Sequence, residues 1–150
     1  MVATILASVA QFELERSGER RKESAAYLRK SGLWGGGNFT YGYRPEARSG
    51  PEGKRWALVP DPETSQIVSL TAEKIISGSS AAAVCRYLKS AGVPTPNGGS
   101  EWRPQSLLVI LRSPALTGHV MHQGEPVRDD DGLPVMLDPI LSDKTFSSLH

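Results

Sequence analysis

The first thirty residues carry an apolar stripe with helical spacing. Between residues 2 and 12 the apolar side chains recur three and four positions apart, which places them on one face of an α-helix. Farther along, the same face carries Arg16, Arg20, Glu23 and Tyr27. The pattern predicts a long helix over 1–30 whose first half packs on protein and whose second half faces a polyanion. The apolar half would consist of Val2, Ile5, Leu6, Val9 and Phe12.

A plainer interpretation of this helix stays open. An amphipathic helix with a solvated, arginine-rich end would show the same pattern. Gly18 interrupts the pattern at a cost of about 1 kcal/mol relative to alanine, which leaves room for a bend or a fraying point near it. The next stretch, "SGLWGGG" at residues 31–37, ends the helix and is expected to form a flexible joint.

Short aromatic and β-branched segments predict two β-hairpins. In the first, the strands would be "NFTYGYR" and "KRWALVP" and the turn "PEARSGPEG", because these residue types are typical of strands and turns respectively. The second would cover residues 118–143, with its turn at Asp130-Asp131-Gly132, a sequence suited to a tight connection.

Three helices are predicted between the two hairpins. The first begins after Asp61, whose carboxylate can cap it, and ends at Gly78. The second covers residues 80–91 behind a serine cap, and the third covers residues 104–112 with proline at its first position. Two short helices of this kind present side chains as a helix-turn-helix does, although the loop between them is longer than the tight turn of that motif.

The predicted elements define a fold class. A last helix is expected to begin at Ser142 or Asp143. The whole would then be an α+β fold that is mainly helical: a long N-terminal helix, followed by a helix-turn-helix-like domain with small β-hairpins.

Charged residues are unevenly distributed along the chain. The net charge is only +1, but residues 1–60 and 84–122 are net positive, whereas 61–83 and 123–150 are net negative. Two basic segments separated in this way could form a split polyanion-binding surface. The counts alone favour the alternative of ordinary solvated charge.

The sequence favours neither catalysis nor metal binding by this chain. His119, His122 and His150 lie near no nucleophile motif, and the first two would point to opposite faces of a strand. One cysteine, Cys85, excludes a disulfide framework. No apolar run reaches membrane-spanning length, and the opening lacks the basic region of a signal peptide. We therefore expect a cytoplasmic protein with no metal and no membrane partner.

Several segments resemble, in order, parts of the large serine recombinases. "ILASVAQFELERSGER" is similar to the long helix that closes their catalytic domain. The aromatic-Gly-Tyr-Arg strand, "VPDPE", "AGVPTP", Trp102 and "ILRSPALTGH" resemble their recombinase domain. The resemblance covers nearly the whole chain, and it rests on the combination of these segments in family order.

The resemblance implies a division of the chain. Residues 1–30 would be the end of a catalytic domain that contacts partner subunits and DNA, 31–37 a linker, and 38–150 a DNA-binding recombinase domain. Residues 31–150 are expected to fold alone. The family's nucleophilic serine and catalytic arginines precede these segments, so this chain is not expected to cut DNA by itself, and the family's chemistry needs no cofactor. The implied partners are a double-stranded attachment site and the other subunits of a homodimer or tetramer.

Within this framework the candidate DNA contacts form three groups. The first would hold phosphates or the minor groove near the crossover point, and the second the DNA backbone after the linker. The third would contact base edges, since arginine suits guanine and glutamine suits adenine. Leu108 and Val109 stand where the family is often polar or basic, although an apolar side chain can still touch a thymine methyl group. The groups are Arg16, Arg20, Arg21 and Lys22; Tyr41, Tyr43 and Arg44; and Arg103, Gln105, Ser106 and Arg112.

Two other functions stay open at this point. A self-contained helix-turn-helix transcriptional regulator would bind a palindromic operator and form a tight dimer through the stripe from Val2 to Phe12. A protein-interaction module would instead use the basic helix to bind an acidic partner. Sequence preference, together with a steep fall of DNA affinity with salt, would argue against the second alternative.

Overall fold

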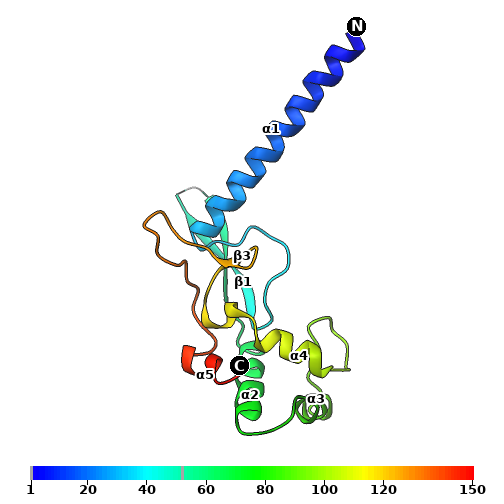
Figure 1. The fold of residues 1–150 in the computed structure, drawn as a ribbon, viewed down its shortest axis with the longest axis vertical. Coiled ribbons are helices and arrows are strands. Elements are labelled where there is room, and N and C mark those ends of the chain that lie inside the picture. The colour runs from blue at the N-terminus through cyan, green and yellow to red at the C-terminus, as the bar shows by residue number, and fades with distance from the viewer. Residues whose placement is uncertain (1, 52) are drawn as a thin grey trace.

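The computed structural model describes the backbone of residues 2–51 and 53–150 and the side chains of residues 6–51 and 53–150. Figure 1 shows one long helix that projects from a more compact part holding the other elements. Within the described residues, two small antiparallel hairpins accompany the helices. The fold is therefore α+β and mainly helical, as predicted.

The long helix α1 (Val2–Lys30) is continuous through Gly18, so this glycine does not end it. Strong helix formers such as Leu14, Glu15 and Glu19 surround the glycine, and they offset its low helix propensity. The helix ends where Leu33 N–H donates to the Leu28 carbonyl at 2.8 Å. Gly32, at φ +71°, supplies the left-handed residue that this C-terminal motif requires.

The first hairpin begins later than predicted and has a shorter turn. β1 (Tyr43–Gly50) pairs with β2 (Gly53–Pro60) from Tyr43↔Pro60 to Gly50↔Gly53. Most of the segment expected to form the turn is therefore strand. Pro45 is tolerated because both strands of a two-stranded sheet are edges, where the N–H groups that face away from the partner strand make no ladder hydrogen bond.

The next three helices lie close to their predicted positions. α2 (Thr64–Ile76), α3 (Ala81–Ser90) and α4 (Pro104–Leu111) are followed by a 3-10 turn, η1 (Pro114–Thr117). We call α2, α3, α4 and η1 the helical body. Asp61 Oδ1 accepts from the backbone N–H of Glu63 and Thr64, both at 2.9 Å, and Ser80 Oγ accepts from Ala83 N–H at 3.1 Å. Both predicted caps are confirmed.

The C-terminal segment contains two turns where one was predicted. β3 (Met121–His122) and β4 (Glu125–Pro126) form a short hairpin around Gln123 and Gly124. Farther along, the bridge between Arg128 and Pro134 closes a second turn, which contains the predicted Asp130-Asp131-Gly132. The last helix, α5 (Asp143–Ser147), is capped by the Ser142 hydroxyl as expected.

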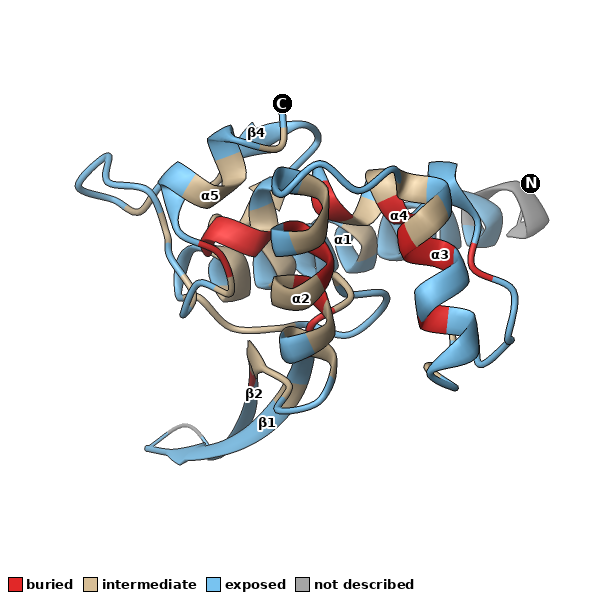
Figure 2. Ribbon diagram, turned by 90° about the horizontal axis from the view of Figure 1, so that it is seen from below, coloured by how far each residue is buried: buried red, intermediate tan, exposed pale blue. Residues whose placement is uncertain are grey.

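The helical body encloses the core. Figure 2 shows buried residues on α2, α3 and α4, and most of their buried side chains belong to one apolar cluster. Cys85 lies in this cluster, as expected for a small buried residue. Leu141, from the segment before α5, also joins it, so the C-terminal segment packs back on the helices. The largest side chains without exposed surface include Val68, Val84, Leu88, Leu107, Leu111 and Leu116.

Candidate nucleic-acid interface

The basic half of α1 is exposed. Arg16, Arg20, Arg21 and Lys22 all lie at the surface. Arg16 and Arg20 are four residues apart and share a face, and the Arg16 guanidinium lies 5.7 Å from the centre of the Phe12 ring. The four cations span nearly two turns of the exposed helix, and the exposed side chains of Glu19 and Glu23 lie among them.

α4 presents a polar face on a rigid support. Leu107 and Leu111 are buried on its inner side, against the core that α3 also contributes to. Trp102, just before the helix, donates its Nε1–H to the Val93 carbonyl at 2.9 Å. This packing fixes the orientation of the helix, and with it the side of α4 that faces outwards. The predicted contacts on or beside α4 are all exposed: Arg103, Gln105, Ser106 and Arg112.

Within α4 itself there is no acidic residue. The nearest carboxylate in sequence, Glu101, forms an ion pair with Lys89 on α3. The outer face of α4 therefore combines hydrogen-bonding groups with two arginines at its ends, and no negative charge on the helix opposes an approaching polyanion.

The structure corrects the prediction for Tyr43. Its side chain is only 3% exposed, and its hydroxyl donates toward the carbonyls of Ala115 at 2.8 Å and Asp138 at 2.9 Å. Burial and the neighbouring Asp138 raise the pKa of Tyr43 to about 12. A buried phenol that joins β1 to η1 and to the C-terminal segment stabilises the fold, so the prediction that Tyr43 contacts DNA is wrong.

The other two residues of that group differ from Tyr43. Tyr41 is half-buried and packs edge-on against Trp102, with ring centres 5.8 Å apart; burial, and secondly Asp61, raise its pKa. Arg44 is exposed on β1. The hydrogen bond from Thr64 N–H is the main cause that lowers the pKa of Asp61, and the charge of Arg44 adds to it.

Residues 31–40 follow the long helix and contact the rest of the chain. Trp34 N–H donates to the Trp56 carbonyl at 2.8 Å, and the Trp34 ring meets Phe39 edge-on at 5.8 Å. A cavity of about 850 Å³ lies between this stretch, the end of α1 and β3. It is lined by residues that include Leu28, Trp34, Phe39, Leu58, His119 and Met121.

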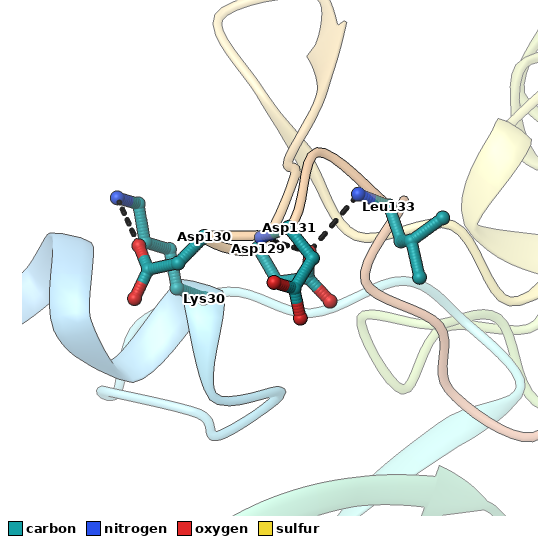
Figure 3. Close-up of polar contacts among 5 residues, drawn as sticks. All are labelled: Lys30, Asp129, Asp130, Asp131 and Leu133. Atoms are coloured by element: carbon teal, nitrogen blue, oxygen red, sulfur yellow. Dashed lines mark hydrogen bonds and ion pairs between the residues drawn. The ribbon is translucent and has the colours of Figure 1, made fainter.

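A second contact holds the end of α1. Lys30 Nζ lies 3.3 Å from Asp130 Oδ1, as Figure 3 shows. Asp129 shapes this loop, because its Oδ1 accepts from the backbone N–H of Asp131 at 3.0 Å and of Leu133 at 2.9 Å. Both members of the Lys30–Asp130 pair are exposed, so the pair contributes little to the stability of the fold.

The predicted subunit-contact stripe is exposed where the structure describes it. Leu6, Val9 and Phe12 each have at least half of their surface exposed. The side chains of Val2 and Ile5 lie outside the described residues. A row of large apolar residues on a projecting helix matches what a partner surface would cover.

The predicted contact residues do not form one continuous patch. Figure 1 places the basic half of α1 on the projecting rod and α4 in the compact part, with Arg44 on β1. Val109 is noted together with Leu108 from the sequence but is not placed among the candidate contacts, and the structure shows that it is 67% exposed on α4. The sequence could have indicated this exposure: residues 107–111 are all apolar, and five consecutive residues cannot all lie on the buried face of a helix.

The described residues give no sign of a metal centre or a membrane span. Among them, no group of three or more His, Cys, Asp and Glu side chains is placed to hold a metal ion. None of the helices formed by these residues combines the length and apolarity needed to cross a bilayer.

Comparisons with known proteins agree with this arrangement. The family model described as Recombinase matches residues 62–150, which include α2, α3, α4 and the C-terminal segment. No curated protein is significantly similar to the chain. Among solved structures, a "Crystal Structure of a LSR-DNA Complex" shares the fold, with a TM-score of 0.59 and 15% identity over 87% of this chain. The chain spans 36% of the length of that protein.

Proposed function

Because this chain belongs to the recombinase family, we propose that it is the DNA-binding part of a site-specific serine recombinase. It would recognise one arm of a double-stranded attachment site during DNA integration or excision. The observation that carries this proposal is the outer face of α4. There Arg103, Gln105, Ser106 and Arg112 are exposed on a helix whose other side is packed into the core.

The two exposed surfaces would have different tasks. α4 has a size and polarity that suit the major groove, where Arg103 and Gln105 could each form a bidentate contact with a base edge. The cations of α1 would bind phosphates, which give affinity but no sequence preference. The similar fold of a protein solved with DNA supports DNA binding by this chain.

The remaining parts of the proposal concern the whole recombinase. A serine supplied by a catalytic domain would attack a phosphodiester, and strands would be exchanged within a tetramer held partly by the stripe Leu6, Val9 and Phe12. This chain would contribute site recognition and subunit contact, would need no cofactor, and would act in the cytoplasm.

The test is a selection of duplexes from a random pool by the 150-residue chain, followed by affinity measurements across salt. We expect one asymmetric half-site and a steep fall of affinity with salt. A symmetric palindrome bound by a tight dimer would instead indicate a transcriptional regulator. No enrichment at any salt concentration would overturn the proposal.

Variants separate the two surfaces. Gln105→Ala should relax the preference at one base pair, with a loss of about 1–3 kcal/mol of discrimination there. Arg20→Gln should weaken binding to all sequences equally and reduce the slope of log K against log salt by about 1. Lys144→Gln, which removes an exposed cation on α5, is the control and should change neither quantity.

A further inference from the structure

Val109 is placed at the centre of the outer face of α4. Successive residues of a helix turn by about 100°, so Val109 lies about 200° from both Leu107 and Leu111. Those two leucines are buried in the core, whereas Val109 is 67% exposed, more than any other large apolar side chain in the described residues. The packing of α4 therefore turns Val109 away from the protein.

The neighbours of Val109 are the proposed base contacts. Gln105 precedes it by four residues, Ser106 by three, and Arg112 follows it by three, which are the spacings of side-chain neighbours on a helix surface. All three are exposed. Val109 is thus an apolar spot enclosed by hydrogen-bonding and cationic groups on a helix without acidic residues.

This position gives valine no role in stabilising the fold. A β-branched residue has a lower helix propensity than alanine or the long polar residues, and an exposed side chain gains nothing from packing. Single exposed apolar residues are common on protein surfaces, so exposure alone would not distinguish Val109. What distinguishes Val109 is its position among the polar and basic side chains of Gln105, Ser106 and Arg112.

Base edges in the major groove offer one apolar group, the 5-methyl of thymine. We infer that Val109 determines specificity by contacting the methyl group of a thymine, between the bases contacted by its polar neighbours. This inference rests on the proposed function, because it requires α4 to lie in the major groove.

The experiment removes the methyl group from the DNA. Each thymine of the half-site selected by the 150-residue chain is replaced singly by deoxyuridine, which keeps base pairing and lacks only the methyl. At one position we expect affinity to fall about four-fold, the effect of burying one methyl group. With Val109→Ala the fall at that position should shrink to less than two-fold, while the effects at other positions stay unchanged.

Two controls support this comparison. Leu133→Ala removes another strongly exposed apolar side chain, in the loop after the Asp130 turn, and should keep the full response to deoxyuridine. Val109→Ala should keep the circular dichroism spectrum and unfolding curve of the parent chain, because alanine favours the helix.

The outcomes keep the two proposals distinct. If the chain selects a half-site but Val109→Ala responds to every deoxyuridine as the parent does, or no position responds, the role of Val109 is wrong while the proposed function stands. If no duplex is enriched, the proposed function fails and the inference about Val109 fails with it.

Discussion

In the helical body Leu88 and Leu116 have no exposed surface, whereas on α1 Leu6 is 64% and Phe12 58% exposed. Both regions are helical, and both carry apolar side chains at helical spacing. In the body these side chains contact other helices of the same chain. On α1 they face outwards along a helix that projects from the compact part (Figure 1).

Apolar residues at helical spacing therefore have different roles in the two regions. Apolar burial in the body stabilises the fold of a single chain. The apolar surface of α1 gives the single chain nothing, so it is suited to stabilising an assembly. Substitutions in the two regions should therefore affect different measurements. Five predictions follow, in decreasing order of effect.

The largest effect is expected in the core. Leu88→Ala should lower the free energy of unfolding by about 2–5 kcal/mol, because it removes buried methyl groups and leaves a cavity. Denaturant unfolding followed by circular dichroism measures this loss. Leu6→Ala, the same change on α1, is the control and should cost less than about 0.5 kcal/mol. Equal losses for the two variants would contradict the comparison.

The next effect comes from Tyr43. Tyr43→Phe leaves the carbonyls of Ala115 and Asp138 without this donor and should cost about 1–3 kcal/mol at neutral pH. Tyr27→Phe on the exposed face of α1 should cost less than about 0.5 kcal/mol.

Tyr43 also predicts a pH dependence. Its pKa is raised from 10.0 to about 12 in the folded chain, so between these values the unfolded chain releases a proton that the folded chain retains. Stability contributed by the neutral phenol is therefore complete below pH 10 and is lost as the pH rises toward 12. Unfolding curves across this window should show the fall for the parent chain and a smaller one for Tyr43→Phe; identical falls would contradict the assignment.

A smaller effect is expected within α1. An added Cβ at Gly18 would meet nothing within 4 Å, so Gly18→Ala should stabilise α1 by about 0.5–1 kcal/mol through helix propensity alone. Helicity measured at 222 nm should persist to higher temperature, while the unfolding midpoint of the helical body stays unchanged. A shift of that midpoint would mean that α1 and the body unfold together.

The smallest effect on folding is expected at Phe12. Phe12→Ala should change the free energy of unfolding by less than about 0.5 kcal/mol. It should nevertheless weaken any self-association of the chain, which sedimentation velocity measures across concentration. A large loss of stability would show that Phe12 packs within its own chain.

Local features of this fold were predictable from the sequence. The caps at Asp61, Ser80 and Ser142 depend on a hydroxyl or carboxylate two or three residues before the N–H groups that they satisfy. Such contacts need no knowledge of the tertiary structure. The helices after Asp61 and Ser80 were accordingly predicted close to their observed bounds, and so was the start of the helix after Ser142.

Features set by distant partners were not predictable. Tyr43 is buried because Ala115 and Asp138, 72 and 95 residues away, meet its hydroxyl. The first hairpin extends through a segment rich in turn residues because pairing with β2 outweighs local preference. The exposure of Val109 depends on which side of α4 meets the core, and an apolar run without periodicity does not determine that side. The other candidate DNA contacts stay predictions.

The length of α1 gives its attachment a mechanical consequence. Its 29 residues make a rod about 43 Å long at 1.5 Å per residue, held at one end by the Lys30–Asp130 pair and by the Trp34–Trp56 hydrogen bond. A tilt of about 10° at this pivot moves the other end by about 7 Å, roughly two base-pair steps along a duplex. The contacts around Lys30 and Trp34 therefore set the direction in which α1 projects, and a small change in their geometry would displace its far end by several ångströms.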